Sequence, residues 1–389
     1  MAMCCEPALL IADEPTTNLD STTQRGILDL LKELLADGRR ALLFISHDLS
    51  TVAEMAQGVI VLQQGREVER GPTTRVLKYP AQPYTRRLLA SRPPRDRFLR
   101  RLPVDEESPD LEALTLLPQA LERRLSELQR QPPLLRVENL QTWFPLRKGW
   151  WGKPQWLRAV DGVSFELFPG ERLGLLGESG SGKTTLGRTL LRLLTPRSGR
   201  ILFEGRNLTA LEGEPLRRLR PHLQVVFQNP YAALNPRHTV GETLMEPLKV
   251  HRLAPGPEER RARALEMLHA VGLGEEHFHR LPRQLSGGQR QRVAIARALM
   301  TRPRLLICDE CVSSLDVSVQ AQVLNLLLDL QERFGLALLF ISHDLAVVRL
   351  MSDRVLVMEG GKIVEAGPVT EVFENPRHPY TRQLLTAGA

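Results

Sequence analysis

The stretch Gly177–Thr184 constrains the fold of this chain more than any other. It matches G-x-x-x-x-G-K-[ST], the loop that wraps nucleotide phosphates in nucleoside triphosphatases. The apolar run Arg172–Leu176 before it predicts a buried strand, and Leu186–Leu194 after it predicts a helix. Glycines let backbone N–H groups curl around phosphate oxygens, and a helix N-terminus favours negative charge. The sequence therefore predicts nucleotide binding by the loop residues Gly177, Glu178, Ser179, Gly180, Ser181, Gly182, Lys183, Thr184 and Thr185.

Composition limits the classes of protein to which the chain can belong. With 389 residues, 42% of them hydrophobic, it is long enough for two ordinary domains. No apolar run approaches the roughly 18 residues of a membrane-spanning helix, and the first residues lack the pattern of a signal peptide, so we expect a cytosolic protein. The net charge is +7, but acidic residues are nearly as numerous as basic ones. We interpret the excess as solvated surface, with attraction to an anionic membrane as the alternative, and predict no nucleic-acid partner.

Three segments near the N-terminus recur near the C-terminus without gaps. The spacing between the copies is constant at 296 residues (310 − 14, 343 − 47 and 380 − 84). An ungapped repeat of this length indicates two copies of one structural unit, so residues 1–90 are predicted to be a second copy of 297–386. The matching pairs are Leu9–Glu14 with Leu305–Glu310, Phe44–Leu49 with Phe340–Leu345, and Pro83–Arg86 with Pro379–Arg382.

The first copy has no counterpart of residues 134–296, and hence no phosphate loop. We interpret residues 1–90 as the C-terminal remnant of a first domain, N-terminally truncated either in the protein itself or through a start placed too late in the gene. A strand at Leu9–Ile11 would lack the strands that belong beside it. Apolar faces and sheet edges are therefore expected to be exposed there.

Residues 91–133 separate the two copies and are predicted to be a linker. Proline pairs punctuate a charged sequence at both of its ends. Leu121, Leu125 and Leu128 lie at helical spacing and predict one short amphipathic helix. We interpret the segment as a solvated spacer that contains a local helix.

Residues 134–389 are predicted to form one complete domain. Strand patterns at Leu305–Cys308 and Ala337–Ser342 alternate with helical patterns, which is typical of a parallel α/β sheet covered on both faces. Residues 229–285 are rich in proline, leucine and charge, with helical periodicity around Arg260–Val271. They predict a small helical subdomain inserted between the core strands.

Two adjacent carboxylates end the apolar run that starts at Leu305. A strand of this kind can deliver acids to a phosphate site. We expect Asp309 to hold Mg²⁺ together with the hydroxyl of Thr184, while Lys183 reaches the β- and γ-phosphates. Glu310 is placed to orient and deprotonate the attacking water.

Two cysteines flank these acids with C-x-x-C spacing. Cys308 and Cys311 alone cannot complete a four-ligand structural zinc site. The first copy has Ala12 and Pro15 at the equivalent positions. We interpret the cysteines as substitutions around a catalytic turn.

Two further side chains are candidates for sensing the nucleotide. Gln224–Gln228 predicts a strand that ends in an amide, which we expect to contact the γ-phosphate or a water on Mg²⁺ and to signal to the helical subdomain. His343 follows another strand and is expected to bridge the γ-phosphate and Glu310. The recurrence of Ser-His-Asp-Leu in both copies supports that role.

A second glycine-containing helix start lies at Leu285–Gln289. Its exposed N–H groups are suited to bind a triphosphate that is held by the phosphate loop of another domain. The residues assigned to this second binding site are Ser286, Gly287, Gly288 and Gln289.

These motifs, in this order across residues 134–389, resemble those of ATP-binding-cassette (ABC) ATPases. The resemblance implies a P-loop NTPase cassette with a RecA-like core, a helical subdomain and an antiparallel β hairpin region, preceded here by a partial second cassette. Phe144 falls where the family places its adenine-stacking aromatic residue. The corresponding motifs are Walker A at Gly177–Thr184, the glutamine loop with Gln228, the signature at Leu285–Gln289, Walker B at Leu305–Asp309, the D-loop at Ser314–Asp316 and the switch histidine His343.

Finer features resemble the oligopeptide and dipeptide importer branch of that family. The tail Asn375–Leu385, within a C-terminal extension at 366–389, is similar to that of peptide-transporter ATPases. The repeat and the run Phe144–Gly149 resemble importers of microcin C, oligopeptides or glutathione that carry two cassettes in one chain. Cys311 departs from the usual proline, and the first copy lacks Walker A, the glutamine loop and the signature.

The resemblance implies an ATPase that couples ATP hydrolysis to import of peptides or related small solutes. It implies the cofactors ATP and Mg²⁺, two membrane permease subunits, a solute-binding protein, and a second cassette that completes the ATP site. The expected location is peripheral, on the cytoplasmic face of the inner membrane. Two alternatives remain: a soluble twin-cassette ATPase that acts on ribosomes or DNA, and a defective cassette without turnover on its own.

Overall fold

The computed structural model describes residues 7–16, 21–36, 38, 40–46, 48–94, 96–104, 111–146 and 155–387. His47 of the repeat and the end of the run Phe144–Gly149, from Arg147 on, lie outside these residues. The chain divides into two compact units, the first comprising residues 1–115 and 314–322 and the second residues 116–313 and 323–389. In the part of the chain that is described, no helix is long and apolar enough to cross a membrane.

The first unit contains two main strand pairs, with helices and a third, two-residue pair near its end. β1 and β2 are parallel, and β3 and β4 form an antiparallel hairpin. Leu28, Val52 and Val76 are buried hydrophobic side chains of its helices. The elements are β1 (Leu9–Asp13), α1 (Ser21–Leu35), β2 (Ala41–Ile45), α2 (Leu49–Met55), β3 (Gly58–Gln63), β4 (Arg66–Pro72), α3 (Thr73–Lys78), α4 (Pro83–Ala90), β5 (Phe98–Leu99) and α5 (Leu111–Leu114), with β6 (Thr115–Leu116) paired to β5.

These elements repeat in the C-terminal part of the chain at the offset found in the sequence. α2 corresponds to α14 (Leu345–Met351), and β3 corresponds to β15 (Arg354–Glu359), each displaced by 296 residues (345 − 49 and 354 − 58). The backbone repeats in detail, because Glu14 and Glu310 both have positive φ, +47° and +49°. The repeat is therefore structural as well as sequential.

The second unit is built on a six-stranded sheet with the order β12-β13-β14-β9-β15-β16. All five residues of β9 (Arg172–Leu176) and all six of β14 (Ala337–Ser342) are buried, as expected for central strands of a parallel sheet. β9 lies between β14 and β15 and pairs with both in parallel. The other strands are β12 (Leu223–Val226), β13 (Leu305–Asp309) and β16 (Lys362–Pro368), the last of which is antiparallel to β15.

A second sheet of four antiparallel strands packs into the same hydrophobic core. Its longest strands are β7 (Leu135–Pro145) and β8 (Trp156–Leu167), which pair antiparallel. Short elements complete this part of the unit. They are β10 (Ser198–Phe203), β11 (Arg206–Asn207), the 3-10 turns Leu208–Ala210 and Arg220–His222, and α8 (Gly213–Leu219).

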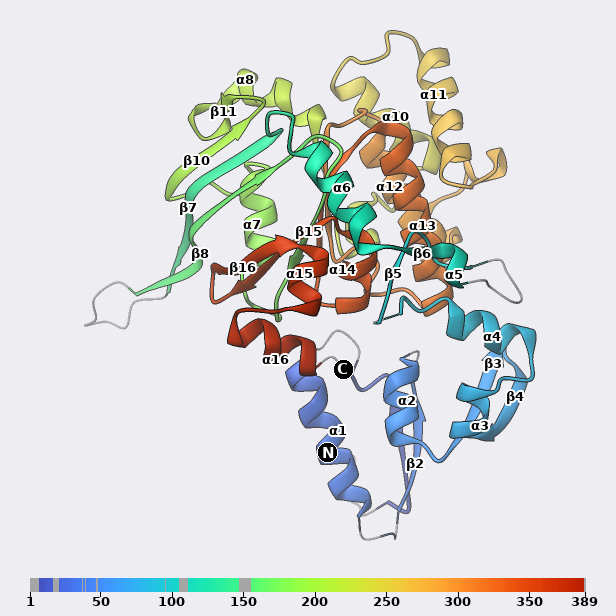
Figure 1. Ribbon diagram of the computed structural model, residues 1–389. Helices are drawn as coiled ribbons and strands as arrows, with labels where there is room; N and C mark the ends of the chain where they lie inside the picture. The colour runs from blue at the N-terminus through green and yellow to red at the C-terminus, as the bar shows by residue number, and fades with distance from the viewer. Residues whose placement is uncertain are drawn as a thin grey trace. The chain divides into compact units, whose positions relative to one another are not determined.

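The helical subdomain lies together at one end of the second unit, where α10, α11 and α12 are labelled in Figure 1. The Thr239 hydroxyl accepts a hydrogen bond from the Glu242 N–H, and the Glu242 carboxylate caps Thr239 in return, which fixes the start of α10. The helices are α9 (Pro230–Ala233), α10 (Val240–Val250), α11 (Pro257–Ala270) and α12 (Gly287–Leu299); the core adds α7 (Lys183–Leu190), α13 (Val317–Phe334), α15 (Val369–Glu374) and α16 (Pro379–Ala387).

The interpretation of the linker as a solvated spacer is wrong for its helix. α6 (Pro118–Leu128) buries Leu121 and Leu125 and belongs to the second unit. Arg124 donates hydrogen bonds to the Gly170 carbonyl oxygen and, from Nε, to Asp353 Oδ1 at 3.1 Å. The three leucines at helical spacing thus form a docked stripe, because a buried carboxylate is available to anchor the charged residue beside them.

Candidate functional site

The phosphate loop leaves the carboxyl end of the central strand β9 and enters α7. The helix begins at Lys183 and ends at Leu190, earlier at both ends than the sequence indicated. Lys183 is 5% exposed, and its Nζ donates to the carbonyl oxygens of Gly177 and Glu178, both at 2.7 Å. The lysine side chain therefore folds back over the phosphate loop, where its ammonium group could contact a bound phosphate.

Gly182 shows why the loop needs glycine. It caps α7 with φ +106°, in the left-handed region that other residues rarely adopt. A Cβ placed there would lie 2.0 Å from the carbonyl oxygen of Ala159 on β8. The hairpin β7–β8 thus packs directly against the phosphate loop.

The C-terminal extension also holds the loop. The N–H of Glu178 donates a hydrogen bond to the hydroxyl of Tyr380 on α16 at 3.1 Å. The tyrosine is 8% exposed. The sequence pattern indicates Tyr380 only as a member of the repeat and of a family tail, since nothing in it links residues 202 positions apart.

The expected metal ligands are close together. The Thr184 hydroxyl donates to Asp309 Oδ1 at 3.0 Å, which joins the start of α7 to the end of β13. Burial raises the pKa of Asp309, and the Thr184 hydrogen bond opposes that effect. A hydroxyl and a carboxylate beside a phosphate loop are the hard oxygen donors that Mg²⁺ prefers, so these residues fit the ion.

Glu310, His343 and Gln228 converge next to the metal ligands. Gln228 Nε2 donates to Glu310 Oε2 at 3.0 Å, and His343 Nδ1 lies 3.3 Å from Glu310 Oε1. The hydrogen bond from His343 lowers the pKa of Glu310, and the same contact raises the pKa of His343. The carboxylate is therefore ionised at neutral pH, as a base must be.

One detail of this cluster differs from the sequence expectation of a strand that reaches Gln228, and a second concerns the backbone of Glu310. β12 ends at Val226, so Gln228 lies two residues beyond the strand and is exposed. Glu310 has φ +49°, a conformation that costs about 1–3 kcal/mol in a non-glycine residue. The N–H of Glu310 donates to the Ile341 carbonyl oxygen at 3.0 Å, and this contact helps to hold the turn.

The signature residues lie at the start of α12. The Ser286 hydroxyl accepts from the Gln289 N–H, and the Gln289 side chain accepts from the Ser286 N–H, which makes a capping box. Gln289 Nε2 also lies 3.3 Å from His277 Nε2 in the helical subdomain. Gly287 and Gly288 form the first turn of the helix, so the N–H groups of this turn point out of its N-terminus.

Phe144 lies on β7, opposite Leu157 of β8. Leu157 comes two residues before Ala159, whose carbonyl oxygen lies next to Gly182 of the phosphate loop. Trp143 points to the other face of the hairpin and stacks with Arg158 and Arg197, each with its guanidinium carbon 4.5 Å from the ring centroid. Phe144 and the tryptophan–arginine stack therefore lie on opposite faces of the hairpin.

The cysteine pair is buried and unbridged. Cys308 and Cys311 are free thiols with 0% and 1% exposure. Among the described residues, no group of three or more histidine, cysteine, aspartate or glutamate side chains could hold a metal ion.

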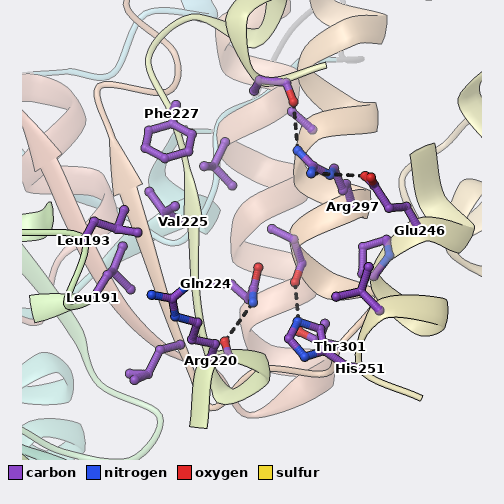
Figure 2. Close-up of a pocket in the computed structure, with 17 residues that line it drawn as sticks. Leu191, Leu193, Arg220, Gln224, Val225, Phe227, Glu246, His251, Arg297 and Thr301 are labelled. Atoms are coloured by element: carbon purple, nitrogen blue, oxygen red, sulfur yellow. Dashed lines mark hydrogen bonds and ion pairs between the residues drawn. The ribbon is translucent and has the colours of Figure 1, made fainter. Parts of the chain in front are cut away.

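A groove of about 430 Å³ opens between β12 and the helical subdomain. Leu193 and Val250 are half-exposed on its rim, and Phe227 lines it one residue before Gln228 (Figure 2). Arg297 of α12 donates to the Ala233 carbonyl oxygen and pairs with Glu246 of α10, and both side chains line the groove. The groove and the Glu310 cluster are thus joined through two consecutive residues.

Comparison with known families and proteins gives consistent matches. The ABC transporter family matches residues 160–313, and the C-terminal region of oligopeptide/dipeptide transporters matches residues 68–115 and 364–388. These last two matches start 296 residues apart (364 − 68), which is the offset of the repeat. The glutathione import ATP-binding protein GsiA of Escherichia coli strain K12, like that of E. coli O157:H7, is 49% identical over 399 residues. The match covers 100% of this chain and 62% of the relative, so the chain spans about three-fifths of the relatives' length.

Solved structures share the fold of the second unit. The dimeric structure of MJ0796, a bacterial ABC transporter cassette, has a TM-score of 0.54 and 30% identity, over 60% of this chain and 98% of that one. CbiO1 of Clostridium perfringens has a TM-score of 0.55 and 29% identity, over 63% of this chain and 92% of that one. The chain therefore belongs to the ABC transporter family, among its ATP-binding cassettes.

Proposed function

We propose that this chain is the ATP-hydrolysing, energy-coupling subunit of an ABC importer for peptides or related small solutes. The observation that carries the proposal is the convergence of Thr184, Asp309, Glu310, His343 and Gln228 beside the phosphate loop. The glutathione-import relatives and the two peptide-transporter matches support the solute class. They also favour a membrane partner over a ribosome or DNA.

The residues divide the reaction between them. The loop amides and Lys183 would hold the β- and γ-phosphates of ATP, with Phe144 as the candidate stacking residue for its adenine. Thr184 and Asp309 would hold Mg²⁺, with Gln228 on its water shell, and the ion would offset phosphate charge when bound. Glu310 would take a proton from the attacking water, while His343 fixes the orientation of the Glu310 carboxylate.

A second cassette would complete the site, because the signature at Ser286–Gln289 has to face a phosphate loop on another domain.

Gln228 is the residue that would link hydrolysis to transport. Gln228 contacts Glu310 and follows Phe227, which lines the groove. A permease segment in that groove would thereby sense the nucleotide state, on the cytoplasmic face of the inner membrane. We propose two membrane permease subunits and a solute-binding protein as further partners of the chain.

The experiment that tests the function is a nucleotide titration and an ATPase assay on the full chain, with and without Mg²⁺. We expect ATP binding by the chain alone, and Mg²⁺-dependent phosphate release that rises with protein concentration as cassettes pair. Lys183→Ala should abolish binding because it removes the buried ammonium group from the phosphate site. Failure of the wild-type chain to bind ATP would refute the proposal.

Tyr380→Phe should weaken ATP binding by removing one anchor of the loop. A single hydrogen bond contributes about 0.5–1.5 kcal/mol, so we expect the Kd for ATP to rise by roughly 2- to 10-fold. The repeat offers a matched control, since Tyr84 is the counterpart of Tyr380 (380 − 296) in the first copy. Calorimetric titration should show no change for Tyr84→Phe. Equal effects of both substitutions would contradict the assignment.

A further inference from the structure

The strands of the first unit leave apolar side chains exposed on one side of each strand. In each of β1, β2 and β3, two alternate residues are large hydrophobic side chains about half exposed to solvent. We call this set the uncovered face. It consists of Leu9 (52%), Ile11 (59%), Leu43 (49%), Ile45 (44%), Ile60 (54%) and Leu62 (62%).

The second copy shows what normally covers such a face. The six counterparts of these residues are at most 3% exposed and lie in the main hydrophobic core. A Cβ on Gly187 of α7 would lie 3.1 Å from Ile341 Cδ1 and 3.5 Å from Ile307 Cγ2, so α7 packs on these residues. The covering element is thus the helix of the phosphate loop. The counterparts are Leu305, Ile307, Leu339, Ile341, Leu356 and Met358.

The first unit also lacks, among its described residues, a strand that corresponds to β9 of the second copy. In the second copy, β9 pairs with β14 on one side and β15 on the other. Among the described residues of the first unit, β2 pairs with β1 alone and β3 with β4 alone. The edges of β2 and β3 therefore present N–H and C=O groups that an added parallel strand can pair with.

We propose that the uncovered face binds the phosphate-loop half of an ABC cassette, a polypeptide of the same kind as residues 134–296 of this chain. Its strand would insert between β2 and β3, and its loop helix would cover Ile11 and Ile45. A second copy of this chain fits less well, because its own residues 134–296 are already packed in its second unit. The curated relatives are long enough to supply such a half. The 399 matched residues are 62% of each relative, which leaves about 240 residues outside the match, against 163 in 134–296.

A fusion tests this directly. A copy of residues 134–296 is joined in front of Met1 of the full chain, which restores the register of the repeat because residue 1 is the counterpart of residue 297 (297 − 296). Amide hydrogen exchange in Ala41–Ile45 and Gly58–Gln63 is then compared with that of the original chain. We expect it to slow at least tenfold in the fusion. Unchanged exchange would overturn the proposal.

Ile45→Asp provides the matched control. In the original chain this side chain is exposed, so the substitution should leave exchange in β3 unaltered; in the fusion it should abolish the gain in protection. If the fusion does not fold, co-expressed residues 134–296 should be retained by the tagged chain and lost with Ile45→Asp, and no retention would count against the proposal. Slow exchange in the original chain together with concentration-dependent dimerisation would assign the face to a second copy instead, and would also overturn it. None of these readouts depends on ATP hydrolysis.

Discussion

Glu310→Gln is expected to lower the rate of ATP hydrolysis by about 10²- to 10⁴-fold, the usual contribution of a general base. The glutamine keeps the size and the hydrogen-bonding capacity of the side chain but cannot accept the proton of the attacking water. Binding should be nearly unaffected, because Lys183 and the loop amides are the groups assigned to the phosphates. The Kd for ATP should therefore stay within a few-fold of the wild-type value, and phosphate release is the measurement that changes.

The repeat supplies an unusually close control for this substitution. Glu14 is the counterpart of Glu310 and has the same backbone, with its N–H donating to the Ile45 carbonyl oxygen at 2.9 Å. It has no phosphate loop in its own copy of the sequence. Glu14→Gln should leave turnover unchanged. A comparable loss of activity in both variants would mean that Glu310 acts through folding rather than as a base.

The parts of the site that could be predicted from the sequence are those in which one strand end determines the position of a side chain. Asp309 ends the buried strand β13 and Glu310 follows it, while Gly177 follows the buried strand β9. Their meeting at the carboxyl edge of the sheet therefore follows from parallel topology. The contact between Glu310 and His343 was expected for the same reason. Both of these side chains leave neighbouring strands, β13 and β14, which pair in parallel.

Other features depend on contacts that leave no periodic signal. The Tyr380 hydroxyl reaches the Glu178 N–H because α16 packs under the loop, and the residues between them give no hint of that distance. α6 looked like a solvated helix because its apolar stripe is only three leucines long. Its anchor is Asp353, 229 residues away in the sequence from Arg124. Long-range polar contacts of this kind require the folded structure.

That anchor belongs to a buried ionic cluster at the start of β9. Asp353 is 2% exposed and Arg172 8%. Asp353 Oδ1 accepts from a terminal nitrogen of Arg172 at 2.7 Å, and Oδ2 accepts from the Arg172 backbone N–H at 2.9 Å. Burial alone would raise the pKa of Asp353, but the arginines Arg172 and Arg124 outweigh it and lower the pKa. The cluster ties the strand of the phosphate loop to β15 and α6.

Asp353→Asn is therefore expected to destabilise the second unit by about 3–5 kcal/mol, because it leaves the Arg172 guanidinium buried without its counter-charge. Trp143 and Trp156 stack on arginines of this unit, so tryptophan fluorescence during urea titration reports its unfolding. Glu214→Gln, which breaks the exposed pair with Arg218, should cost only about 0.3–0.5 kcal/mol. Similar losses in the two variants would show that the cluster is not a stabilising feature.

The pH dependence separates the charge of Asp353 from its shape. A carboxyl whose pKa is lower in the folded than in the unfolded state contributes stability above its unfolded pKa, and that contribution is lost as pH falls through the folded value. The pKa of Asp353 is lowered, so the advantage of wild type over Asp353→Asn should be complete at neutral pH and shrink in strong acid. A constant difference across that range would point to packing instead.

Because β9 leads into Gly177 and Lys183, loss of the Asp353 cluster should also weaken ATP binding, whereas Glu310→Gln should leave ATP binding intact.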